Sequence, residues 1–192
     1  MNFLGHLYLS GDEPLVIVGN FMADAVKGRD LGRFDPGVQR GIRLHRAIDV
    51  FTDQHPLTLL GRERLRAHAG KYAGVALDLF YDHVLAANWH ELHDEPLHVF
   101  NHRMYALLEA HGHLLPERTR GMLPYMMRHD WLGSYAGIAG IGRALEGLAA
   151  RVPAGEPLRG AERVLDAHYA DYRTEGLAFV REIREHLATL TP

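Results

Sequence analysis

The 192-residue sequence contains no cysteine, which excludes disulfides, thiolate zinc sites and cysteine nucleophiles. It also lacks an uncharged apolar run of the roughly 20 residues that a membrane-spanning helix needs. The first ten residues, MNFLGHLYLS, are apolar but have no basic segment before them. Acidic Asp12 and Glu13 follow, so this stretch does not resemble a signal peptide. We therefore expect a soluble, cytoplasmic protein with no membrane partner.

Three familiar catalytic signatures are missing as well: a glycine-rich phosphate loop, a serine nucleophile elbow and an HExxH zinc motif. The net charge is only -3 at pH 7, with histidine neutral. That balance predicts neither general nucleic-acid binding nor attachment to a charged membrane. An electrostatic partner must therefore be sought in local clusters of charge.

Hydrophobic periodicity indicates helices throughout the chain. Apolar residues recur mostly at helical spacing, and period-two alternation bounded by turn residues is hard to find. The length suits one compact domain over residues 1–192, so we predict a single-domain, all-α helical bundle. The segment LVIV at 15–18 is β-branched and could form a strand instead, which propensity alone leaves open.

The clearest predicted helix begins at Pro36, with Asp35 as its N-cap, and ends before Pro56. Other helices are predicted at 75–89, 96–111, 118–128, 135–150 and 158–190. The last of these is long enough to be bent or broken, and Gly176 is its obvious weak point. Glycine and proline mark loops at 28–37 and 151–160.

What the sequence has in excess is histidine, with fourteen residues. In LHRAIDVFTD, at 44–53, the residues His45, Asp49 and Asp53 recur every fourth position, so they share one side of the predicted helix. Histidine with carboxylates suits a divalent ion such as Mn²⁺, Mg²⁺, Fe²⁺ or Zn²⁺. The same spacing also describes the polar face of an ordinary solvated helix, and both interpretations stand.

A second polar group lies in LDLFYDH, where Asp78, Asp82 and His83 are surrounded by aromatic residues. A buried charge costs several kcal/mol unless it is paired or bound to a cation. These carboxylates therefore either pair with arginines of another helix or help to bind a metal. His6 and Asp24 also have apolar neighbours, where a lone histidine is usually a hydrogen-bonded core residue and a lone aspartate is often a cap.

Six cations occur within twenty residues: Lys27, Arg29, Arg33, Arg40, Arg43 and Arg46. They form either a surface for a phosphate or an acidic partner, or a solvated face with internal salt bridges. Further along, His129 and Asp130 form a literal HD dipeptide. Such a pair supplies adjacent metal ligands in HD phosphohydrolases, but a dipeptide also occurs often by chance.

The segments MNFLGHLYLS, VGNFMADAVKG, GIRLHRAIDVFTDQHP and ALDLFYDHVLAANWHEL together resemble, in order and spacing, the bacterial acyl carrier protein phosphodiesterase family. The family patterns NFLAHLxL, GNxxADFVKG, HRxID-x-x-TD and LDxxxDHxL are matched through about residue 95. Afterwards the match is scattered, as in DAHY at 166–169. Gly5 replaces the usual alanine, and the glycine-rich SYAGIAGIGRALEG matches poorly.

This resemblance implies a divergent, metal-dependent HD-phosphohydrolase-like fold, often with manganese. It implies hydrolysis of the phosphodiester that joins 4′-phosphopantetheine to a serine of holo-acyl carrier protein, which gives the apo form. The metal ligands implied are His6, Asp24, His45, Asp49 and Asp82. The catalytic groups implied are Asp24, Asp49 and His83. Asn2, Asn20, Asp53 and Asp78 are second-tier candidates, whereas no family motif covers His129 and Asp130.

Acyl carrier protein is small, acidic and helical, so its recognition requires a basic surface near the metal. The candidates for that surface are Lys27, Arg29, Arg40 and Arg43. Two alternatives stay open. One is a phosphohydrolase of a nucleotide or another phosphodiester, which would follow if the poorly matching C-terminal half contacts the substrate. The other is a non-catalytic helical binding protein.

Overall fold

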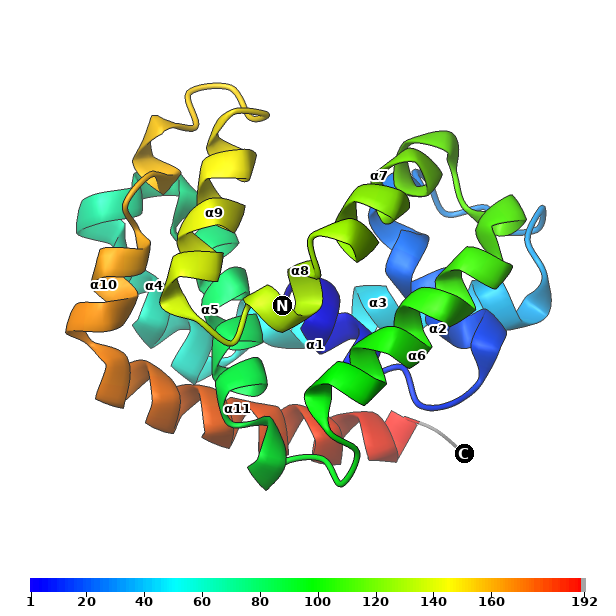
Figure 1. Cartoon of the computed structure of the whole chain (residues 1–192). Helices are drawn as coiled ribbons and strands as arrows, with labels where there is room; N and C mark the ends of the chain where they lie inside the picture. Colours follow the sequence, from blue (N-terminus) through cyan, green and yellow to red (C-terminus); the bar gives the residue numbers. More distant parts are fainter. Residues whose placement is uncertain (191–192) are drawn as a thin grey trace.

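The structure is a computed structural model that describes residues 1–190, and it contains helices but no strand in this range (Figure 1). The all-α prediction is therefore confirmed. The α-helices are α1 (Phe3–Tyr8), α2 (Pro14–Met22), α3 (Pro36–Gln54), α4 (Pro56–Ala69), α5 (Ala73–Ala87), α6 (Leu97–Ala110), α7 (Glu117–Arg128), α8 (Trp131–Ser134), α9 (Ile138–Ala149), α10 (Glu162–Ala167) and α11 (Tyr169–Leu190). None of the helices described is long and apolar enough to cross a membrane.

The LVIV segment forms the first turns of α2, so a strand at 15–18 is wrong. Pro14 occupies the first turn of this helix, where its fixed φ and missing N–H are tolerated. The helix then packs directly on α3 at two glycines. A Cβ added to Gly19 would come within 2.2 Å of the Val38 carbonyl oxygen, and one added to Gly41 within 2.1 Å of the Val16 carbonyl oxygen. The two backbones therefore touch, which requires glycine on both helices.

The predicted helix at 36–55 is confirmed as α3. The Asp35 carboxylate accepts a hydrogen bond from the Gly37 backbone N–H at 2.7 Å, and the helix ends at Gln54, before Pro56. The predictions at 75–89, 96–111 and 118–128 correspond to α5, α6 and α7, and most of 135–150 is α9. Helix α4 was not predicted, although Pro56 in its first turn and His55 as its N-cap are ordinary start signals.

The predicted helix at 158–190 is broken, but not at Gly176. The chain turns at His168, between α10 and α11, whereas Gly176 lies inside α11. A Cβ on Gly176 would come within 3.0 Å of the Val84 side chain on α5. This glycine therefore allows close packing of α11 on α5 and does not weaken the helix.

The short helix α1 rests on α5 and is held there by Asp82, whose carboxylate is completely buried. Its oxygens accept hydrogen bonds from the backbone N–H groups of Asn2 and Gly5, both at 3.1 Å, and of Leu4 at 2.8 Å. These N–H groups have no partner within their own helix turn, so a carboxylate at this end satisfies them and complements the helix dipole. The buried hydrophobic side chains from α1 to α11 form one continuous core.

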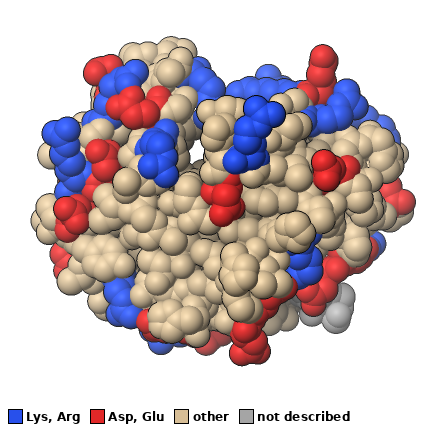
Figure 2. Space-filling view, in the orientation of Figure 1, with Lys and Arg blue, Asp and Glu red and all other residues tan. Residues whose placement is uncertain are grey.

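The upper part of the molecule divides into two arms (Figure 1). Helices α7 and α9 stand on either side of α1 and the chain's N-terminus. The space-filling view shows a hollow between these arms, with basic side chains on both sides of it (Figure 2). Helix α1 therefore lies at the base of a cleft.

Candidate metal centre

Two histidines and two aspartates converge from three segments of the N-terminal part of the chain. His6 comes from α1, Asp24 from the short 3-10 helix η1 (Ala23–Ala25), and His45 and Asp49 from α3. Asp49 Oδ1 lies 3.3 Å from His6 Nε2, and Asp49 Oδ2 lies 3.2 Å from His45 Nε2. Asp24 Oδ1 is also 3.2 Å from His45 Nε2. The two imidazole rings stack with their centroids 3.9 Å apart.

Asn20 holds both histidines from the opposite side and is itself fully buried. Its Oδ1 is 2.9 Å from His6 Nδ1 and 3.0 Å from His45 Nδ1, and its backbone oxygen is 2.9 Å from the same His45 nitrogen. The amide Nδ2 donates to the His6 carbonyl at 3.0 Å and to Ser10 Oγ at 2.8 Å, so Oδ1 must face the rings. Each Nδ1–H then donates to Asn20, which directs each Nε2 atom toward the carboxylates.

The charges of the cluster favour a cation. The hydrogen bond from His45 lowers the pKa of Asp24. Burial alone would raise the pKa of Asp49, but hydrogen bonds to His45 and His6 hold it well below its ordinary value. Burial lowers the pKa of His6, whereas for His45 the two carboxylates outweigh burial and raise the pKa to about 9. Both aspartates are therefore ionised, and a proton on His45 balances part of their charge.

The donor atoms fit a divalent ion. One ligand atom each from His6, His45 and Asp49 can be chosen so that all lie within 4.8 Å of one another. Ligands about 2.1 Å from one ion lie roughly 3 to 3.5 Å apart, and the observed separations of 3.2 and 3.3 Å agree with this. The histidines are buried, but the side chains of Asp24 and Asp49 are 83% and 44% exposed, which leaves the solvent side of the cluster open.

The structure does not bring Asp82 into this cluster. Both of its oxygens already accept hydrogen bonds from the first turn of α1, the helix that carries His6. Burial raises the pKa of Asp82 to about 7, although the Met1 amino group and the three backbone N–H groups act in the opposite direction. Asp82 therefore serves the first turn of α1, whereas its role as a metal ligand stays a prediction.

His83 also lies apart from the cluster. Its Nδ1 donates to the Tyr135 carbonyl oxygen at 2.8 Å, and its buried Nε2 has no hydrogen-bond partner in the described part of the chain. Burial lowers its pKa. His83 is thus tied to the turn that precedes α9.

Of the second-tier residues, Asp78 accepts a hydrogen bond from the Met1 amino group at 2.9 Å, and Asp53 pairs with Arg62 of α4.

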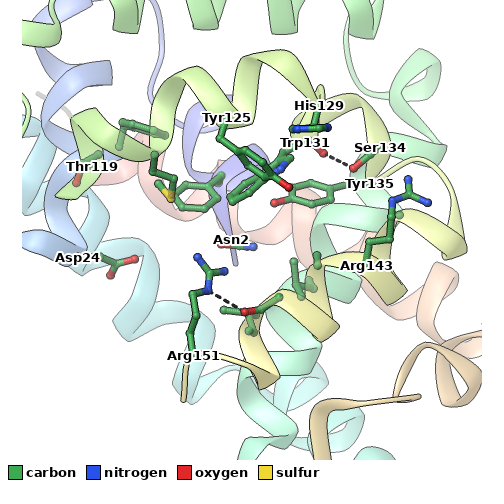
Figure 3. A pocket seen from close by; sticks show the side chains of 18 of the residues that line it. Asn2, Asp24, Thr119, Tyr125, His129, Trp131, Ser134, Tyr135, Arg143 and Arg151 are labelled. Atoms are coloured by element: carbon green, nitrogen blue, oxygen red, sulfur yellow. Dashed lines mark hydrogen bonds between the residues drawn. The ribbon is translucent and has the colours of Figure 1, made fainter. Parts of the chain in front are cut away.

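The metal cluster opens into a cavity of about 340 Å³ that Asn2, Asp53 and Asp78 also line. A larger cavity of about 460 Å³ lies beside it, between α7–α8 and α9 (Figure 3). The two cavities share Asn2, Asp24 and Leu148 as lining residues. Asp24 therefore stands at the junction between the metal cluster and the larger cavity.

The basic residues predicted to contact a partner divide into two pairs. On α3, Arg40 forms an ion pair with Glu13, and Arg43 donates a hydrogen bond to the Gln39 side chain at 2.9 Å. Lys27 and Arg29 follow η1 and are exposed, and neither forms an ion pair with any residue in the described range. The second pair follows Asp24 closely in the sequence and is free to contact a partner.

Sequence reasoning missed three arginines, Arg118, Arg143 and Arg151, which line the larger cavity from α7, α9 and the turn after α9. They are scattered along a segment without a recognisable motif, so no local signal marks them. The HD dipeptide serves neither metal ligand role: the Asp130 side chain caps α8 by accepting from Gly133 N–H at 3.2 Å, and His129 lines the larger cavity.

An all-helical chain in which histidines and aspartates converge on an open cluster that could hold a cation has the features of a metal-dependent hydrolase site. A model of the family described as acyl carrier protein phosphodiesterase matches residues 1–183. The chain belongs to the acyl carrier protein phosphodiesterase family, as its sequence motifs predict.

Relatives with that name come from several bacteria. The one from Photorhabdus laumondii is 36% identical over 173 residues, which cover 90% of this chain and 87% of the relative. The one from Escherichia coli O157:H7 is 37% identical over 177 residues, 91% of each chain, and that from Serratia proteamaculans is 31% identical over 188 residues, 96% of each. No solved structure matches the chain. The HD-phosphohydrolase-like relationship stays a prediction.

Proposed function

We propose that this protein hydrolyses the phosphodiester that joins 4′-phosphopantetheine to the serine of holo-acyl carrier protein, and that it does so with a divalent metal ion. The observation that carries the proposal is the convergence of His6, Asp24, His45 and Asp49 on an open cluster, in a chain of this family. Water attacks phosphorus, the bond to the serine oxygen breaks, and apo-acyl carrier protein and free 4′-phosphopantetheine are the products.

The proposed ligands are His6, His45 and Asp49, with Asp24 as the fourth. A bound divalent cation would polarise the phosphoryl oxygens and ease the ionisation of water. The family resemblance implies manganese, and a donor set of imidazole and carboxylate also suits Mg²⁺, Fe²⁺ or Zn²⁺. Asn20 keeps both Nε2 atoms free for the metal, and Asp82 positions His6 by holding α1 against α5.

The chain must also move two protons, one away from the attacking water and one to the departing serine oxygen. Asp24 is the foremost candidate for the first role, because its carboxylate is exposed and stands at the junction of the two cavities. Asp49 faces the same cavity as the metal cluster. His83 lines neither cavity, so we assign it a positioning role at the turn before α9 and not the predicted proton transfer.

The test uses protein stripped of metal with a chelator and reloaded separately with Mn²⁺, Mg²⁺, Fe²⁺ or Zn²⁺. Each sample is incubated with holo-acyl carrier protein, and mass spectrometry follows the loss of the phosphopantetheine arm. Loss of the arm only in metal-loaded samples is expected. If the arm stays in place with every metal, the proposal is wrong. Release of phosphate from a nucleotide or dinucleotide under the same conditions would then favour the phosphohydrolase alternative. The absence of turnover with any of these substrates would favour the non-catalytic binding protein.

A further inference from the structure

We propose that the cleft between α7–α8 and α9 is the binding site for the pantetheine arm of the substrate. This inference rests on the proposed function, and it names the part of the protein that holds the portion of the substrate beyond the phosphate. The cavity in this cleft, about 460 Å³, lies within the range of about 300 to 1,000 Å³ that is usual for small-molecule sites.

The position of the cleft follows the connectivity of the substrate. The arm is bonded directly to the phosphate, so its site must adjoin the metal cluster. The cleft does so through Asn2 and Asp24, which line both cavities. In Figure 3, Asn2 lies in the middle of the cleft and Arg151 reaches toward it from the turn after α9. A phosphate held at Asp24 and the cation can therefore send its pantetheine substituent into the larger cavity.

The walls of the cleft match the chemistry of the arm, which carries two methyl groups, two amides, a hydroxyl and a thiol. One wall is aromatic: Phe3 lies 5.5 Å from Phe21 and 6.5 Å from Trp131, and Trp131 lies 5.7 Å from Tyr125, between ring centroids. Such rings accept methylene and methyl groups. Tyr125, His129 and Ser134 supply polar groups at the same cavity, as amide recognition requires.

Arginines give the cleft its charge. Arg118, Arg143 and Arg151 line it, and within residues 1–190 none of the three forms an ion pair. Arg151 Nε donates to the Gly147 carbonyl at 2.8 Å, which leaves its terminal nitrogens available. Among residues 1–190, Asp24 is the one carboxylate that lines this cavity. An excess of unpaired guanidinium groups suits a phosphodiester and the acidic protein attached to it.

The opposite wall is formed by small residues of α9. Gly140, Ala144 and Gly147 line the cavity, and they come from the glycine-rich segment that matches the family motifs poorly. A Cβ on Gly147 would meet only Arg151 Nη2, at 3.8 Å, which is an ordinary contact. A larger side chain at Gly147 would therefore enter the cleft without displacing the backbone, and leucine favours a helix more than glycine does.

Calorimetry measures the binding of 4′-phosphopantetheine and, separately, of inorganic phosphate to the full-length, metal-loaded protein. The variants are Gly147→Leu and, as a second way to fill the cleft with a flexible side chain, Ala144→Met. The matched control is Gly121→Leu on α7, where a Cβ has no atom within 4 Å and which does not line the cavity.

We expect 4′-phosphopantetheine to bind the two cleft-filling variants at least about tenfold more weakly than it binds the wild type. It should bind the Gly121→Leu control as tightly as the wild type. Inorganic phosphate, which needs only the metal end, should bind all four proteins alike. The inference is wrong if 4′-phosphopantetheine binds the wild type no more tightly than phosphate, or if both cleft-filling variants bind it normally. Suppose that the wild type binds 4′-phosphopantetheine tightly, that Gly147→Leu abolishes this binding, and that the metal-loaded protein still leaves holo-acyl carrier protein intact. These results would support the cleft as the binding site and overturn the proposed function.

Discussion

Replacing Asn20 by alanine tests whether the metal site depends on a residue that does not touch the metal. In the structure the Asn20 side chain makes four hydrogen bonds, two to histidine Nδ1 atoms and two through its Nδ2. His45 Nδ1 keeps a second acceptor in the variant, because the Asn20 backbone oxygen is 2.9 Å away. In the described part of the chain, His6 Nδ1 has no second acceptor of this kind, so the loss falls mainly on His6.

The magnitude follows from these contacts. Loss of a partner that orients a metal-binding histidine typically weakens metal affinity by about 10- to 100-fold. Leaving the buried His6 nitrogen without an acceptor costs about 1 to 3 kcal/mol of folding stability. We therefore expect Asn20→Ala to bind Mn²⁺ about 10- to 100-fold more weakly and to unfold at a lower urea concentration.

Two further variants separate orientation from general destabilisation. Ser10→Ala removes one partner of Asn20 Nδ2 but no contact to an imidazole, so it should lose about 1 kcal/mol of stability and keep its metal affinity. Asn20→Asp keeps an oxygen that accepts from both rings and loses both Nδ2 donations, so it should be less stable yet bind metal better than Asn20→Ala. Titration against a chromophoric chelator measures the affinity, and urea unfolding the stability. Folded Asn20→Ala protein with wild-type affinity would refute the reasoning.

Four other predictions concern the ligands, their protons, the support of α1 and the partner surface. Asp49→Asn should lose bound metal by elemental analysis and lower hydrolysis of holo-acyl carrier protein roughly 100-fold or more, while circular dichroism stays unchanged; retention of metal would contradict its ligand role. Below its pKa of about 9, His45 carries a proton that a metal ion must displace. Metal affinity should therefore rise with pH, by up to about tenfold per pH unit between pH 6.5 and 8.5. A metal affinity that calorimetry finds independent of pH would contradict this prediction. Asp82→Asn leaves one backbone N–H of α1 without an acceptor and should cost about 1 to 3 kcal/mol in urea unfolding; an unchanged midpoint would show that α1 is held otherwise. Lys27→Glu and Arg29→Glu should raise the KM for holo-acyl carrier protein and reduce the dependence of this KM on salt. Arg40→Glu serves as the comparison, because Arg40 pairs with Glu13. A KM that changes with neither the substitutions nor the salt concentration would exclude this surface.

Local signals were sufficient for much of the fold. The N-cap Asp35, the following Pro36 and the 3.6-residue periodicity predict α3 and both of its ends, because caps and helical faces depend on neighbours within a few residues. The same periodicity predicts that His45 and Asp49 lie side by side, and the structure places them 3.2 Å apart. Helix α4 lies outside these predictions, because its start signals directly follow the end of α3.

Contacts between distant segments decided the rest. The sequence by itself determined the helical class, the family and the set of polar residues from which a metal site is built. Only the tertiary structure decided that His6 and Asp24 join His45 while Asp82 supports α1 from below. The structure also shows LVIV within a helix and places three unmarked arginines around one cleft. The physical reason is that helix formation is local, whereas convergence depends on how helices pack. Here that packing rests on the close contact of Gly19 and Gly41, residues 22 positions apart in the chain.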